Sequence, residues 1–454
     1  MTTSGAIRHT PLIGSRSSGD ILAWEQGRPR TAGQFLADVS YLAALLPDRP
    51  TVLNHASNRY GFLVGLAAAI LRRQVTLLPQ NRASESLRRL VDDHPGCYCL
   101  TDQSETVEGV DSVLIPSQQS GAPSSMDLPR IPIDQVVAIA FTSGSTGRPQ
   151  PHTKTWGALT SVAYATGVAL RINDRKPLTV VATVPHHHMF GLEASVMLPI
   201  MHGATMHAGR PLFPVDVANA LTDIAGAWIL VTTPLHLRAC LMEGVKLPPG
   251  GLILSATAPL ARSIAQEVER QFQTEVHEIF GFAEAGSVAS RRTIDGDQWH
   301  PLDGVRVTQD RGACVVQASY LPAPIQVPDR ISVDTHGRFV LHGREADQVN
   351  VAGHRVSLGD LTQKLLAIDG VQDGIFFLPD DESHLVTRLM ALVVAPGKTS
   401  EEIHSALRMH IDPVFLPRPL ICVPSLPRNG TGKLPRESVL MLARQYMEGS
   451  GHGL

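Results

Sequence analysis

The sequence has 454 residues, with 39 basic and 42 acidic side chains and a formal net charge of −3. Hydrophobic residues make up 43% and charged residues 18%, which excludes wholesale disorder. The near-neutral balance argues against a protein that binds nucleic acid or membrane surfaces through bulk charge. The start lacks a basic segment followed by an apolar one, and the apolar run at 61–71 is too short to span a membrane. We therefore expect a soluble cytoplasmic protein.

The apolar segments alternate with helical patterns through most of the chain. Ordinary domains hold about 100–200 residues, so one to three domains are expected. Continuous apolar strands separated by helices predict an α/β protein with mostly parallel sheets. Strands are expected at 112–115, 135–141, 178–184, 227–232, 251–255 and 313–317, with helices at 157–170 and 259–272. After about Gly343, short strands and amphipathic helices predict a smaller α+β domain. We expect a large domain at 1–343 and a small one at 344–454.

A loop rich in glycine and hydroxyl groups follows the strand at 135–141. It reads Thr142-Ser143-Gly144-Ser145-Thr146-Gly147-Arg148-Pro149. The glycines allow tight turns, and the backbone N–H and hydroxyl groups can donate hydrogen bonds to a polyphosphate. The spacing of a Walker A loop is missing. The alternative is a Ser/Gly surface loop without function.

This loop resembles the phosphate loop of the adenylate-forming superfamily, which includes acyl-CoA synthetases, peptide-synthetase adenylation domains and luciferases. Further segments follow in the order of that superfamily, at 253–260, 278–286, Asp329, 343–361 and 426–436. The resemblance implies a large N-terminal α/β domain and a small mobile C-terminal domain. It also implies a reaction in two halves, in which ATP and Mg²⁺ convert a carboxylic acid to an acyl-adenylate and a thiol then displaces AMP.

The resemblance assigns ATP-binding roles to several residues. Glu284 would help hold Mg²⁺, Phe280 would stack on adenine, and Ala258 and Pro259 would line the adenine pocket. The loop residues Thr142, Ser143, Gly144, Ser145 and Gly147 would bind phosphate, with Thr146 as a catalytic residue. A single carboxylate is a usual protein ligand of nucleotide-bound Mg²⁺. The alternatives are a solvated glutamate for Glu284 and a core aromatic residue for Phe280.

The resemblance also assigns residues to the ribose, the attacking carboxylate and the thiol. Asp329 would accept the ribose hydroxyls, and Arg344, after an intervening hairpin, would assist at ribose or phosphate. Lys433, in the turn Asn429-Gly430-Thr431-Gly432-Lys433, would bridge the substrate carboxylate and the α-phosphate. Gly353 and Arg355 would line the thiol channel. Turn or surface positions are the alternatives for Asp329, Lys433 and Arg355.

Three adjacent histidines, His186 to His188, follow the strand at 178–184. Alternate side chains of a strand share a face, so His186 and His188 could meet one metal ion, but no nearby carboxylate or cysteine pair supports zinc. The resemblance instead places His188 and Phe190 in the acyl pocket, together with Gly281, Phe282 and Ser287. Core packing is a third possibility. The bulk of Phe282 favours a short or flat aryl acid.

The compact form of the chain looks most like the ligases of aryl polyene and xanthomonadin pathways, which load hydroxybenzoates onto an acyl carrier protein. We therefore expect an acid–thiol ligase with such a carrier as acceptor. A free-standing acyl- or aryl-CoA synthetase is the alternative. Gln150, Ala283 and Ala346 depart from the superfamily pattern and keep open a non-catalytic relative that binds nucleotide or carrier protein.

Overall fold

The computed structural model describes residues 8–79, 82–103, 107, 109–116, 128–143, 149–175, 177–310, 313–344, 348–351, 354–379, 389–429 and 432–449. For residues 142, 143, 149, 344, 348, 350, 354, 355, 448 and 449 it describes the backbone only. Within these residues no helix is long and apolar enough to cross a membrane.

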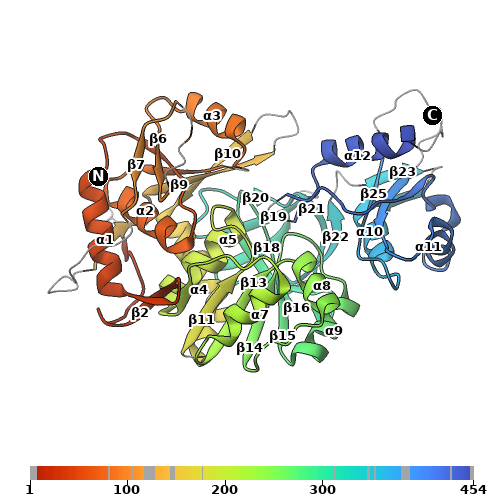
Figure 1. Ribbon diagram of the computed structural model, residues 1–454, viewed down its shortest axis with the longest axis horizontal. Coiled ribbons are helices and arrows are strands. Elements are labelled where there is room, and N and C mark those ends of the chain that lie inside the picture. Colours follow the sequence, from red (N-terminus) through yellow and green to blue (C-terminus); the bar gives the residue numbers. More distant parts are fainter. Residues whose placement is uncertain are drawn as a thin grey trace.

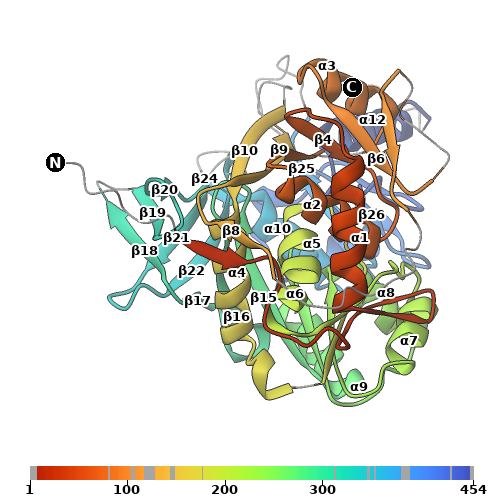
Figure 2. The same ribbon diagram turned by 90° about the vertical axis from the view of Figure 1, so that its left-hand side faces the viewer.

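The first sheet has six strands in the order β10-β9-β5-β4-β6-β7. They are β4 (Thr51–Asn54), β5 (Val75–Leu78), β6 (Tyr98–Thr101), β7 (Ser112–Leu114), β9 (Val136–Ser143) and β10 (Pro149–Thr155). All neighbours are parallel except β9 and β10. The connecting helices include α1 (Ala32–Leu45), α2 (Arg59–Leu71) and α3 (Ser84–Asp92). Helix α2 is almost wholly buried and packs beside α1, so the apolar run at 61–71 is a core helix (Figure 2).

The second sheet has eleven strands in the order β21-β22-β17-β16-β15-β14-β13-β11-β12-β2-β3. They are β2 (Ile21–Glu25), β3 (Arg28–Thr31), β11 (Leu178–Ala182), β12 (Thr205–His207), β13 (Ala227–Thr232), β14 (Gly251–Ser255), β15 (Glu275–Phe282), β16 (Gly286–Arg292), β17 (Gln298–Pro301), β21 (Asp329–Val333) and β22 (Phe339–Arg344). The run from β2 to β15 is parallel, and both flanks are antiparallel.

Helices and smaller sheets complete this part of the chain. The helices are α4 (Trp156–Ala169), α5 (Met189–Leu192), α6 (Leu198–His202), α7 (Pro214–Thr222), α8 (Pro234–Glu243) and α9 (Arg262–Phe272), with a π-helical turn at Glu193–Met197. Strands β18 (Val305–Asp310), β19 (Ala313–Ala318) and β20 (Ile325–Gln326) form one small sheet, and β1 (His9–Pro11) pairs with β8 (Arg130–Pro132). A large core cluster joins side chains of α1, α2, α4 and α6.

The sequence explains the parallel strands directly. Strand β14 is buried along its full length and β13 at all but its first residue, as expected for strands covered on both faces. Helix α9 alternates buried apolar residues, such as Val268 and Phe272, with charged residues that face solvent. The predicted α/β class is therefore confirmed.

The chain after β22 forms its own sheet and core. Its elements are β23 (Gln348–Val351), β24 (His354–Ser357), α10 (Leu358–Leu366), β25 (Asp373–Phe377), β26 (Met390–Val394), α11 (Ser400–Leu407), β27 (Leu420–Cys422) and α12 (Arg436–Gly449). Two core clusters consist only of residues from this part, which lies at one end of the molecule in blue (Figure 1). These features support the domain division near 344, which we retain as a proposal.

Candidate active site

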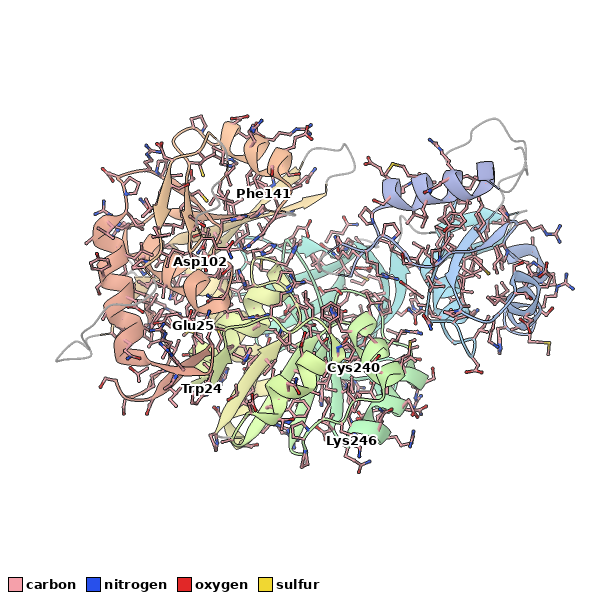
Figure 3. All side chains as sticks on the ribbon, in the orientation of Figure 1. Trp24, Glu25, Asp102, Phe141, Cys240 and Lys246 are labelled. Carbon is pink, nitrogen blue, oxygen red and sulfur yellow. The ribbon has the colours of Figure 1, made fainter. Side chains whose placement is uncertain are left out.

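A pocket of about 220 Å³ opens where several strands of both large sheets end. Strand β9 contributes Phe141, which is labelled in Figure 3, and the turn after β14 contributes Thr257. The C-terminal part of the chain contributes Asn429 and Lys433. All five residues predicted for the acyl pocket line the same space as Lys433, namely His188, Phe190, Gly281, Phe282 and Ser287.

His187 and His188 line the pocket, and His186 is buried beside them. Burial, followed by the positive charge of Lys433, lowers the pKa of His188 to about 4, and burial lowers the pKa values of His186 and His187 well below the usual value. Nε2 of His186 contacts the backbone oxygen of Ala56. Among the described residues, no group of three or more His, Cys, Asp or Glu side chains could hold a metal ion. This geometry favours the acyl-pocket interpretation of His188.

Close backbone packing shapes the other wall. A Cβ atom on Gly281 would lie 2.4 Å from the backbone oxygen of Gly286, across the hairpin of β15 and β16. A Cβ atom on Gly191 would lie 1.8 Å from the backbone oxygen of Pro185. Neither backbone oxygen can move aside cheaply, so both positions require glycine. The pocket keeps its form because these residues lack side chains.

The loop that carries Lys433 is held by a network of hydrogen bonds. The backbone N–H of Lys433 donates to Oδ1 of Asn429 at 2.9 Å, and Gly432 adopts a positive φ of 78°. Arg428 donates to Asp373 at 2.7 and 2.5 Å and to the backbone oxygen of Gly432 at 2.5 Å. Arg428 and Asp373 are therefore candidate positioning residues for Lys433.

Glu284 lies beside two basic side chains of β10. Its Oε1 is 3.6 Å from Nε2 of His152, and the buried Lys154 donates from Nζ to the backbone oxygen of Glu284 at 2.9 Å. The carboxylate is 43% exposed, so it can reach a cation in the open part of the site. One accessible carboxylate suits Mg²⁺ that keeps water and nucleotide phosphates as its other ligands. Lys154 thus supplies a buried positive charge at the turn that carries Glu284.

The turn predicted to bind adenine is strained and firmly anchored. Thr257 has φ of 78°, an uncommon conformation for a β-branched residue, and such strain often marks functional sites. The buried Glu278 accepts hydrogen bonds from the backbone N–H of Leu260 and from Arg291. Ala258 and Pro259 are exposed on this turn, and Gln363 of α10 donates to the backbone oxygen of Pro259. The turn therefore meets the C-terminal part of the chain.

Phe280 packs into an aromatic core. Its ring centroid lies 5.4 Å from that of Phe339, 5.8 Å from that of Trp299 and 6.2 Å from that of Phe282. It is 8% exposed and is not among the residues that line the pocket. The structure thus gives Phe280 the packing role that the sequence left open as an alternative. Adenine stacking on its ring stays a prediction.

Asp329 and Arg344 lie directly opposite each other on β21 and β22. The intervening turn is closed by Asp334, which accepts hydrogen bonds from the backbone N–H groups of His336 and Arg338. The structure has the hairpin that the sequence predicted between the two residues. Their roles at the ribose stay predictions.

Part of the predicted site lies outside the described residues or is described by its backbone alone. Gly144, Ser145, Thr146, Gly147 and Gly353 lie outside the described residues. For Thr142, Ser143 and Arg355 only the backbone is described, in β9 and β24. Ser143 pairs with Pro149 across β9 and β10, so both ends of the phosphate loop lie side by side at the end of this ladder.

Sequence reasoning missed Glu193, Glu278, Asp373 and Arg428. Glu193 interrupts an apolar stretch from Met189 to Ile200, and a charge in such a stretch is a signal that could have found it. Arg428 lies inside a segment that the sequence singled out, but its partner Asp373 is 55 residues away. No local pattern joins the two.

Comparisons with known proteins place the chain in a family. Residues 51–316 match the family model described as AMP-binding enzyme. A 4-coumarate–CoA ligase of Rhodobacter capsulatus is 29% identical over 271 residues, covering 60% of this chain and 66% of the relative. A 2-succinylbenzoate–CoA ligase of Bacillus velezensis is 22% identical over a match that covers 87% of this chain and 86% of the relative. The match with the coumarate ligase thus leaves about a third of that relative unmatched.

Solved structures share the fold. The o-succinylbenzoate CoA synthetase of Bacillus subtilis, in complex with its acyl-adenylate intermediate, has a TM-score of 0.78 at 17% identity and covers 92% of this chain and 95% of that one. An anthranilate CoA ligase in complex with anthranoyl-AMP has a TM-score of 0.76 at 15% identity, covering 95% of each chain. The expected superfamily is confirmed: the chain belongs to the AMP-binding enzyme family, and its CoA-ligase relatives make it an acid–thiol ligase of the acyl-adenylate-forming type.

Proposed function

We propose that this protein adenylates an aryl carboxylic acid, a hydroxybenzoate, and transfers the acyl group to the phosphopantetheine thiol of an acyl carrier protein. The observation that carries the proposal is the convergence of Lys433 with the predicted acyl-pocket residues in one pocket. A pocket of about 220 Å³ with the aromatic walls Phe141, Phe190 and Phe282 suits a small flat acid better than a long fatty acid.

The residues of the chain can divide the work of the first half-reaction. Lys433 offsets the negative charge of the acid as it approaches the α-phosphate, which is electrostatic stabilisation of the kind that dominates such reactions. Glu284 would hold Mg²⁺, and the ion would neutralise phosphate charge. Lys154 holds the turn through the backbone oxygen of Glu284, and His152 lies beside its carboxylate. The apolar side chains of the pocket exclude water from the acid.

CoA is a second candidate acceptor, because the relatives of Rhodobacter capsulatus and Bacillus velezensis are both named as CoA ligases. Gly353 and Arg355 remain our candidates for the thiol channel with either acceptor. The net charge of −3 selects neither, since carrier proteins are acidic and CoA carries phosphates.

The test offers both acceptors in parallel. Wild-type protein is incubated with ATP, Mg²⁺ and a panel of hydroxybenzoates and fatty acids, and pyrophosphate release is measured first. Each active acid is then tested with CoA and with a holo acyl carrier protein, and thioesters are identified by mass spectrometry. Hydroxybenzoyl carrier protein supports the proposal. Thioester formation with CoA alone, or a preference for long-chain acids, would contradict it.

A further inference from the structure

Glu193 is a carboxylate in the wall of the acyl pocket. It begins the π-helical turn that follows α5, is only 5% exposed, and lines the pocket together with Gly286 and Ser287. A buried carboxylate is costly unless it is paired, and π-helical turns are often found at functional sites. Its position therefore calls for an explanation beyond packing.

Ser287 fixes the carboxylate through one of its two oxygens. Oε2 of Glu193 accepts a hydrogen bond from the backbone N–H of Ser287 at 3.0 Å and another from its hydroxyl at 2.6 Å. Burial raises the pKa of Glu193, whereas Ser287 and the nearby ammonium group of Lys154 oppose that shift. Lys154 itself is buried and donates to the backbone oxygen of Glu284. The carboxylate is thus oriented and partly balanced in charge.

The other oxygen lies beside Gly286, which has no side chain to cover it. A Cβ atom at Gly286 would lie 2.6 Å from Oε1 of Glu193, and Gly286 adopts a positive φ of 80°. Both hydrogen bonds described for this carboxylate fall on Oε2. An ionised carboxylate can accept about four hydrogen bonds, so Oε1 retains the capacity to accept one from a bound molecule.

The two ends of the pocket differ in accessibility. Lys433 is exposed and comes from the C-terminal part of the chain, whereas Glu193 is buried in the N-terminal part. Both residues line one pocket, so we infer that an acid with its carboxylate at Lys433 has its far end at Glu193. Apolar side chains, among them Val184, Ile279 and Phe282, line the same pocket.

We propose that Glu193 determines specificity by accepting a hydrogen bond from a hydroxyl or amino group at the far end of the acid. Because Lys154 already balances part of the charge, a neutral donor suits the site. A second carboxylate at that end would face Glu193 and be rejected. This inference rests on the proposed adenylation and narrows its substrate class.

The test compares matched benzoates in pyrophosphate release. The panel contains benzoate, 4-methylbenzoate, 3- and 4-hydroxybenzoate, 4-aminobenzoate and benzene-1,4-dicarboxylate. We expect kcat/KM for the better hydroxy or amino acid to exceed that for 4-methylbenzoate by roughly tenfold to a hundredfold, the usual effect of a hydrogen bond to a charged group. The dicarboxylate should be the poorest substrate.

Glu193→Gln should reduce the preference for the hydroxy or amino acid over 4-methylbenzoate and improve the relative rate of the dicarboxylate. Glu85→Gln makes the same change at a side chain of α3 that is 78% exposed, and should keep the wild-type ratios. If Glu193→Gln fails to fold, the kcat/KM ratios of the wild-type protein across the panel of acids still test the inference.

Equal rates for hydroxy, amino and methyl acids, or a preference for the dicarboxylate, would overturn the inference while leaving adenylation intact. No pyrophosphate release with any acid would contradict the proposed function itself, and the inference with it.

Discussion

Arg428 provides a sharp test of how the loop around Lys433 is positioned. Its guanidinium makes two hydrogen bonds to Asp373 and one to the backbone oxygen of Gly432, next to Lys433. The side chains of Arg428 and Asp373 are 17% and 13% exposed. In the variant Arg428→Ala, Asp373 keeps the hydrogen bond from the backbone N–H of Gly374 and the more distant charge of Arg238, but loses its ion pair with Arg428.

The burial of this ion pair sets the expected loss in the free energy of unfolding of Arg428→Ala. Removal of one partner from a fully buried ion pair costs about 3–5 kcal/mol, and exposed pairs contribute about 0–1 kcal/mol. The pair of Arg428 and Asp373 is mostly buried, so Arg428→Ala should lower the free energy of unfolding by about 2–3 kcal/mol, between these limits. We also expect pyrophosphate release to fall by about tenfold or more, because small displacements of a reacting group cost large factors in rate.

The assay combines urea unfolding with pyrophosphate release. Arg428→Lys and Asp373→Asn should lose less stability and less activity than Arg428→Ala. The double variant Arg428→Ala/Asp373→Asn should lose less than the sum of its two single variants. Arg444→Ala, at an exposed position of α12, is the matched control. Pyrophosphate release by Arg428→Ala within twofold of the wild type would refute a role of this pair in positioning Lys433.

Three further predictions concern the pocket and the turn at Glu284. Gly281→Ala should cost about 1–3 kcal/mol and raise KM for the acid, because the new Cβ would meet the backbone oxygen of Gly286; urea unfolding and acid titrations measure both effects. Lys154→Met should raise the Mg²⁺ concentration needed for half-maximal pyrophosphate release, since the turn at Glu284 loses its donor; an unchanged Mg²⁺ requirement would contradict this role. The pKa of His188 is about 4 in the folded protein and about 6.5 when unfolded, so the folded state favours the neutral ring. The contribution of His188 to the free energy of unfolding should be complete above pH 6.5, and it should fall by up to about 3 kcal/mol as the pH drops toward 4. Urea midpoints at pH 7.5 and 5 should differ less in His188→Gln than in the wild type.

Much of the fold is visible in local patterns of the sequence. The apolar runs of β13 and β14 predict buried parallel strands, and the segment between Asp329 and Arg344 predicts the hairpin that the structure has. The residues predicted for the acyl pocket came from the resemblance of short segments to superfamily motifs. Such features depend on neighbours along the chain, and therefore leave a signal in the sequence.

The features that the sequence did not reveal depend on distant partners. Glu193 meets Ser287 across 94 residues, and Lys154 meets the backbone of Glu284 across 130. Neither pairing leaves a periodicity or a fixed spacing. Phe280 also depends on a distant partner. Its packing against Phe339 indicates a core residue, whereas its place in a superfamily motif predicts adenine stacking.

The most direct measurement is acid-dependent pyrophosphate release by the wild type and by Lys433→Ala. Lys246→Ala, at an exposed lysine labelled in Figure 3, is the control. We expect release to fall by about 10²–10³-fold in Lys433→Ala, the usual effect of removing one electrostatic contact to the transition state, with ATP binding and the unfolding midpoint nearly unchanged. The Lys246→Ala variant should match the wild type. Near-normal pyrophosphate release by Lys433→Ala would contradict the assignment of this pocket as the site of adenylation.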